Sequence, residues 1–106
     1  MEQLKDKTLS EIVGKIVNQI NPTKIYLFGS RARGDHRLDS DYDIVLIYDG
    51  EKSKREIQLE SRRSCWDMDV SMDILALTSE ELKRFHRITN TLEYEITNNG
   101  VVIYER

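Results

Sequence analysis

Residues 29–47, GSRARGDHRLDSDYDIVLI, decide the fold of this 106-residue chain because they join two apolar runs through a polar connection. The first run, residues 25–28, stops at Gly29-Ser30, and the second, residues 44–48, ends at an Asp-Gly turn signal. Runs this short and this apolar are typical of strands that are buried on at least one face. We therefore expect two strands with polar residues between them.

Outside this stretch, apolar residues recur with the periodicity of helices or of strands. Three- and four-residue spacing predicts an amphipathic helix up to about residue 20, which Asn21-Pro22 ends. The remaining expected elements, in chain order, are a helix at residues 51–64, a strand at 71–77, a helical segment that starts after a capping-box pattern at Thr78 and continues through residue 96, and a strand at 101–104. We expect one α/β domain, residues 1–106.

The composition limits the classes of function. A net charge of −3 provides no overall positive field, so we expect no direct, stable binding of nucleic acid. No stretch approaches the roughly 20 apolar residues of a membrane span, and residues 1–10 lack the apolar core of a signal peptide, which predicts a cytoplasmic protein. The single cysteine, Cys65, excludes an intrachain disulfide, and Cys65 and Trp66 are expected to fill the core. The short chain leaves little surface for a second substrate, which we expect a partner to supply.

Asp41 and Asp43 are the first candidates for metal ligands. They lie two residues apart at the start of a predicted strand, whose period of two points both carboxylates to one side and Tyr42 to the other. Two carboxylates this close repel each other unless a divalent cation lies between them, and Mg²⁺ prefers such oxygen ligands. The alternative is a capped strand start or a solvated loop in which the acids bind nothing.

Asp73 is a third candidate ligand. It lies within the apolar run of residues 70–77, where a buried and unpaired charge is costly. If the third strand lies beside the second, Asp73 joins Asp41 and Asp43 in a cluster able to hold two magnesium ions, as in two-metal nucleotidyl transfer. The alternative is an acid at a strand edge that faces water.

Gly29 and Ser30 are candidates for binding phosphate. Glycine lets backbone amides approach an anion closely, and Ser30 adds a hydroxyl at the start of a helical turn whose free N–H groups attract anions. Arg31 and Arg33 supply guanidinium groups for phosphate oxygens. A Gly-Ser pair after a strand is by itself only a turn. Its combination with the acids predicts a site for a nucleotide and its metal.

The stretch of residues 29–47 resembles the signature of the DNA polymerase β-like nucleotidyltransferases, in which Gly-Ser is followed by Asp-x-Asp and by a third acid on a later strand. Its Gly-Ser-x-Ala-Arg-Gly and Ser-Asp-x-Asp portions are most similar to the minimal nucleotidyltransferases, the MntA-type antitoxins that accompany HEPN-domain toxins. With the first helix and the terminal ITNNGVVIYE, the resemblance covers nearly the whole chain. It implies the polymerase β-like fold, a small mixed sheet packed with helices.

The resemblance also implies roles for six residues: magnesium binding and catalysis for Asp41, Asp43 and Asp73, and nucleotide binding for Gly29, Ser30 and Arg33. Asp67 and Asp69 lie near Asp73, but only Asp73 falls within an apolar strand pattern. The implied donor is ATP, and the implied reaction is transfer of AMP to a tyrosine of a partner HEPN toxin, by the antitoxin of a type VII pair. Transfer to a small hydroxylated molecule, or an antitoxin that acts by binding alone, are the alternatives.

Overall fold

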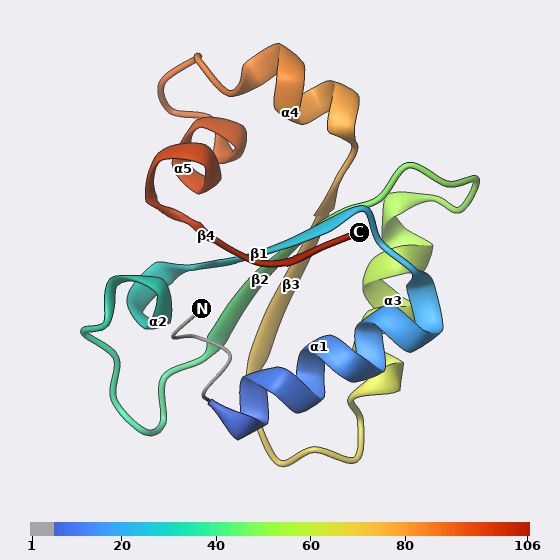
Figure 1. The fold of residues 1–106 in the computed structure, drawn as a ribbon, viewed down its shortest axis with the longest axis vertical. Helices are drawn as coiled ribbons and strands as arrows, with labels where there is room; N and C mark the ends of the chain where they lie inside the picture. The colour runs from blue at the N-terminus through green and yellow to red at the C-terminus, as the bar shows by residue number, and fades with distance from the viewer. Residues whose placement is uncertain (1–5) are drawn as a thin grey trace.

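Four strands form one mixed sheet in the computed structural model, which describes residues 6–106 (Figure 1). The strand order is β3-β2-β1-β4, and β1 (Lys24–Phe28) pairs antiparallel with both β2 (Tyr42–Ile47) and β4 (Val101–Glu105). β3 (Met72–Leu77) lies at one edge of the sheet and runs parallel to β2. The expected mixed sheet is confirmed. Residues 1–5, part of the segment considered above as a signal peptide, lie outside the described residues.

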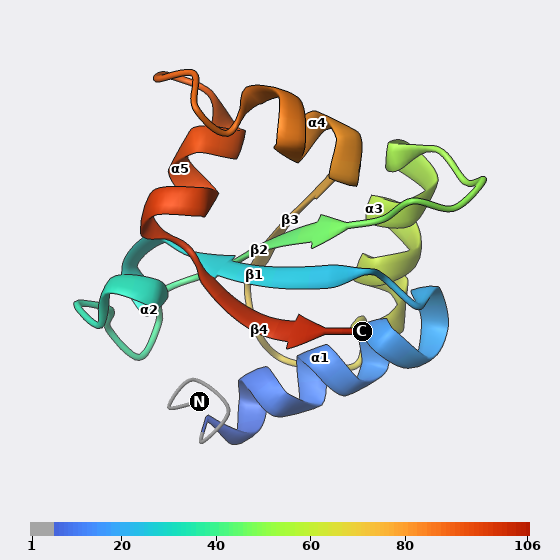
Figure 2. The ribbon, with the colours of Figure 1, turned by 45° about the horizontal axis from the view of Figure 1, so that its top comes forward.

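Helices cover both faces of the sheet (Figure 2). The helices are α1 (Lys7–Ile20) and α3 (Lys54–Ser64) on one face, α4 (Ser79–Phe85) and α5 (Leu92–Asn99) on the other, and the short α2 (Gly29–Arg33) directly after β1. Side chains along β2 alternate between two cores, because Ile44 and Leu46 pack toward α1 and α3 while Val45 and Ile47 pack toward α5. None of the helices among residues 6–106 is both long and apolar enough to span a bilayer.

The first helix forms where its apolar spacing predicts it. Four side chains of α1 at three- and four-residue spacing are buried: Leu9, Ile12, Ile16 and Ile20. The Asp6 carboxylate caps the N-terminus by accepting hydrogen bonds from the backbone N–H groups of Thr8 and Leu9. Asn21 ends the helix in the left-handed conformation, with a φ of 57°. The predicted helix over residues 51–64 is also confirmed, as α3.

Two expectations about the remaining chain are wrong. The helical spacing through residue 96 does not form one helix, because Thr91 caps a separate α5 and its hydroxyl donates to the Phe85 and Ile88 carbonyls. Asn90, with a φ of 68°, turns the chain between α4 and α5. Cys65 is buried as expected, whereas Trp66 is 82% exposed and contributes nothing to the core.

Candidate active site

The three predicted metal ligands lie at the same end of the sheet, where the neighbouring strands β2 and β3 begin. Asp41 immediately precedes β2, Asp43 is the second residue of β2, and Asp73 is the second residue of β3. In the parallel pairing, Asp43 lies directly opposite Asp73. Neighbouring strands are about 4.8 Å apart, so the two carboxylates start from adjacent backbone positions. The expectation that the third strand lies beside the second is confirmed.

The electrostatics of Asp43 reflect this crowding of acids. Burial raises the pKa of Asp43, and the charges of Asp73 and Asp41 raise it further, while Arg33 lowers it. The carboxylate is therefore less ready to ionise than an exposed one, and a cation placed among the three acids would reverse this effect.

Asp73 is exposed, so the expectation that it is a buried charge within an apolar strand is wrong. Its side chain is 58% exposed because β3 is the edge strand of the sheet. The nearest cation is the Arg62 guanidinium of α3, with Nη2 3.9 Å from Asp73 Oδ1. What makes Asp73 a candidate ligand is its position opposite Asp43.

The acids fit magnesium by their chemistry, although they do not enclose an ion. No three Asp, Glu, His or Cys side chains of residues 6–106 are close enough together to hold a metal as they stand. The donor set nevertheless consists of carboxylate oxygens, which Mg²⁺ prefers, and the exposed Asp73 lies opposite Asp43 on the neighbouring strand. The assignment of Asp41, Asp43 and Asp73 as magnesium ligands remains a prediction.

Gly29 and Ser30 begin α2 beside the Asp43 carboxylate. Phe28 pairs with Asp43 across β1 and β2, so the chain enters α2 next to this acid. Gly29 has a φ of 73°, a conformation that side chains disfavour. A Cβ added to Gly29 would collide with Asp43 Oδ2 and lie 3.1 Å from Asp43 Cγ. Glycine is thus required here both by the backbone conformation and by the neighbouring carboxylate. The predicted helical turn after Gly-Ser is confirmed, and phosphate binding by Gly29 and Ser30 remains a prediction.

Arg31 and Arg33 lie on different sides of α2, because helix positions that are two apart in sequence are separated by about 200° around the helix axis. Arg33 is exposed, and its Nε donates to Asp35 Oδ2 at 3.3 Å. Arg31 is only 10% exposed, and its guanidinium is hydrogen-bonded to backbone carbonyls. Arg31 is therefore not free to bind phosphate as considered from the sequence, whereas Arg33 remains the predicted phosphate ligand.

Two cavities are lined in part by residues of α2. The one beside Gly29 and Arg33 has a volume of about 470 Å³ and is walled by Phe28 and by Leu92 of α5. The other, of about 520 Å³, lies toward the N-terminus of α1 and includes Arg31 in its lining. Only the first adjoins the predicted phosphate-binding residues.

These features agree with the family expected from residues 29–47. Residues 10–106 match the family model described as "Polymerase beta, Nucleotidyltransferase", and the chain therefore belongs to this family of nucleotidyltransferases. Among curated proteins, the chain is similar to "Protein adenylyltransferase MntA" of Aphanizomenon flos-aquae, with 26% identity over 100 residues that cover 92% of this chain and 67% of that protein.

Solved structures with the same fold include nucleotidyltransferases and toxin–antitoxin proteins. A putative nucleotidyltransferase from Sulfolobus solfataricus matches with a TM-score of 0.65 and 24% identity, over 98% of this chain and 84% of that one. A toxin–antitoxin with AMP-PNP matches with a TM-score of 0.61 and 17% identity, over 92% of this chain and 73% of that one. A mutant of the MntA-HpeT toxin-antitoxin matches with a TM-score of 0.66, the same identity and the same coverage.

Proposed function

We propose that residues 1–106 form one magnesium-dependent nucleotidyltransferase domain that transfers AMP from ATP to a tyrosine hydroxyl of a partner HEPN-type toxin. It would act in the cytoplasm as the antitoxin of a type VII toxin–antitoxin pair. The observation that carries this proposal is the pairing of Asp43 with Asp73 on parallel strands, next to the Gly29 turn. Similarity to a protein adenylyltransferase supports AMP as the transferred group and a protein as its acceptor.

Each predicted residue has a role in this reaction. Gly29 and Ser30 bind the triphosphate at the start of α2, and Arg33 pairs with phosphate oxygens. Asp41, Asp43 and Asp73 would hold two magnesium ions, which when bound would supply neutralisation of phosphate charge and activation of the attacking hydroxyl. The acceptor oxygen bonds to the α-phosphorus, the bond to the β-phosphate breaks, and pyrophosphate and a proton are released.

The open side of the site favours an acceptor on another protein. β3 is the edge strand, and the Asp73 side chain is 58% exposed, so the acids are not enclosed on this side. The other side is bounded by α2 and α5, which meet around the cavity beside Gly29. A tyrosine carried on a protein surface has access to Asp73 without displacing any element among residues 6–106.

The test is an AMP-transfer assay with a helical partner protein that carries an Arg-x-x-x-x-His motif and is encoded beside this chain. Incubation with ATP and Mg²⁺ should add adenylyl groups to a partner tyrosine, detected by mass spectrometry. The Asp41→Asn, Asp43→Asn double variant should add none. Transfer that survives the double change would contradict the metal assignment. Full neutralisation of the toxin by an inactive double variant would instead establish an antitoxin that acts by binding alone.

A further inference from the structure

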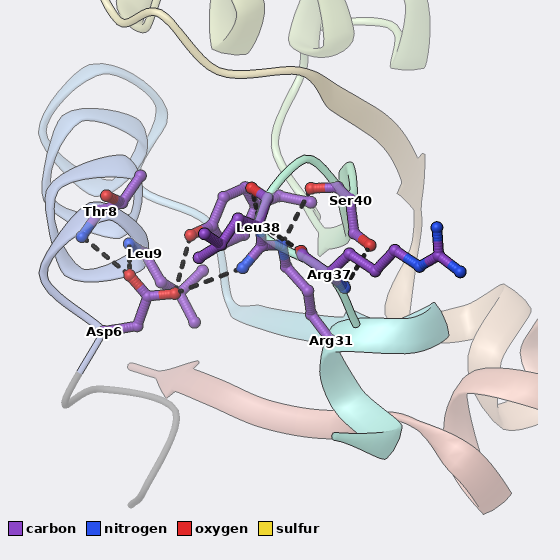
Figure 3. Close-up of polar contacts among 8 residues, drawn as sticks. Asp6, Thr8, Leu9, Arg31, Arg37, Leu38 and Ser40 are labelled. Atoms are coloured by element: carbon purple, nitrogen blue, oxygen red, sulfur yellow. Dashed lines mark hydrogen bonds and ion pairs between the residues drawn. The ribbon is translucent and has the colours of Figure 1, made fainter. Parts of the chain in front are cut away.

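Arg31 binds the loop that leads into the predicted metal ligands (Figure 3). Its Nε donates to the Ser40 carbonyl at 3.0 Å, and its Nη2 donates to the Leu38 carbonyl at 3.2 Å and to the Arg37 carbonyl at 3.5 Å. The loop also closes on itself, because the Arg37 N–H donates to Ser40 Oγ and the Ser40 N–H donates to the Arg37 carbonyl. One guanidinium thus attaches a closed turn to α2.

These contacts fix the backbone on one side of Asp41, and the sheet fixes the other. The Ser40 carbonyl belongs to the peptide unit before Asp41 and accepts from Arg31. The Tyr42 N–H belongs to the peptide unit after Asp41 and donates to the Ser71 carbonyl at 2.9 Å. With both peptide planes hydrogen-bonded, the direction of the Asp41 Cα–Cβ bond is set by groups that never touch its carboxylate.

Arg31 is itself held in place from the α1 side. Its guanidinium lies 3.9 Å from the centre of the Tyr42 ring, and its Nη1 lies 3.8 Å from Asp6 Oδ2. The Tyr42 hydroxyl donates to the same Asp6 oxygen at 2.7 Å. Asp6 also caps α1, so the contacts of Arg31 connect the start of the first helix to the loop before Asp41.

We propose that Arg31 is a positioning residue that orients Asp41 for metal binding. The proposal rests on the metal role of Asp41 in the proposed function. It assigns to Arg31 a role different from the phosphate contact considered from the sequence. The planar guanidinium matters because it donates to three carbonyls at once, and a lysine ammonium at the end of a flexible chain does not reproduce this geometry.

The experiment compares Arg31→Lys with a matched change in the same loop, Arg37→Lys. The side chain of Arg37 has no hydrogen bond or ion pair among residues 6–106, so Arg37→Lys controls for the arginine-to-lysine change itself. Mn²⁺ binding is measured by the loss of the free-ion electron paramagnetic resonance signal, at a temperature where circular dichroism reports each variant folded. Amide hydrogen exchange of residues 37–42 reports the order of the loop without any metal.

Arg31→Lys is expected to weaken Mn²⁺ binding by about 10–100-fold, the usual effect of removing a partner that orients a ligand, and to speed exchange in the loop. Arg37→Lys should match the wild type in both measurements. If Arg31→Lys fails to fold, Asp6→Asn replaces it, because asparagine is an equally good N-cap but carries no charge for Arg31. Asp6→Asn should weaken Mn²⁺ binding in the same direction.

Two negative results are distinguishable. Wild-type Mn²⁺ affinity in a folded Arg31→Lys or Asp6→Asn variant would overturn the positioning role while leaving the proposed function intact. No Mn²⁺ binding by the wild-type protein itself would overturn the metal site, and the positioning role with it.

Discussion

Replacing Gly29 by alanine should disable the site more than it destabilises the fold. Gly29 has a φ of 73°, and an added Cβ would collide with the Asp43 carboxylate. Gly34, at the other end of α2, has a φ of 86° with nothing within 4 Å of an added Cβ. Comparing Gly29→Ala with Gly34→Ala therefore separates backbone strain, which both variants share, from the displacement of Asp43, which only Gly29→Ala causes.

The magnitudes follow from these two environments. An alanine in the left-handed region costs about 1–2 kcal/mol, so each variant should lower the melting temperature by about 4–8 °C per kcal/mol. The colliding Asp43 oxygen is the end of a side chain, which turns away at little further cost in stability. The carboxylate then moves on the order of 1 Å, a displacement that costs about 100-fold in rate at a reacting centre.

The assays are thermal unfolding followed by circular dichroism, and AMP transfer to the partner toxin measured by mass spectrometry. We expect both variants to unfold at similarly lowered temperatures, Gly34→Ala to keep near wild-type transfer, and Gly29→Ala to lose about 100-fold. Equal transfer rates for the two variants would refute the argument, because they would show that the contact between Gly29 and Asp43 does not position the carboxylate.

Three further predictions concern stability. Asp43→Asn should stabilise the metal-free protein at pH 7 by about 0.2–1 kcal/mol, because it removes a negative charge that lies opposite Asp73. Burial and the neighbouring acids raise the pKa of Asp43 above 3.8, so the contribution of Asp43 to stability is present at low pH and is lost as the pH rises through the raised pKa. Urea unfolding in EDTA that finds the variant less stable than the wild type would contradict this prediction. Tyr42→Phe should lower the free energy of unfolding by about 1.5 kcal/mol, because it removes the hydrogen bond that the Tyr42 hydroxyl donates to Asp6. Burial acts to raise the pKa of Asp6, but hydrogen bonds, led by that of Tyr42, lower it below 3.8. The stability due to Asp6 is therefore lost as the pH falls through this lowered pKa, and an advantage of the wild type over Tyr42→Phe that persists in full after Asp6 is protonated would argue against the bond. Thr78→Ala should lower the free energy of unfolding by about 1 kcal/mol, because it removes the capping box of α4, and it should leave AMP transfer unchanged. A loss of transfer in the folded variant would contradict this and show that α4 contributes to the reaction.

The predictable part of the fold depends on local patterns. The apolar runs before Gly29 and after Asp43 each form a strand, and the three- and four-residue spacing before Asn21 forms α1. The break between α4 and α5 escaped prediction because apolar spacing runs through it without interruption. It depends on the Thr91 hydroxyl and on a left-handed Asn90, signals that periodicity does not include.

The sequence predicts which residues belong to the site and in what order they occur. The burial and the neighbours of these residues depend on contacts between segments distant in sequence. The apolar run around Asp73 predicts a buried acid, yet Asp73 is exposed, and what makes it a candidate ligand is the register of β3 against β2. Arg31 and Arg33 are equivalent as residue types in the motif. Only the path of residues 37–40, which brings three carbonyls to Arg31, distinguishes the buried guanidinium from the exposed one.

The edge position of β3 affects which inactive variant is safest to use. An unpaired strand edge offers free N–H and C=O groups to another chain, and charged side chains on the edge oppose such aggregation. On β3 the Gln58 side chain donates to the Ile74 carbonyl, and Asp73 supplies negative charge beside it. Neutralising Asp73 would therefore remove a safeguard against self-association as well as a predicted ligand. Asp41, which precedes β2 in the interior of the sheet, is the better position for an inactive variant that stays monodisperse.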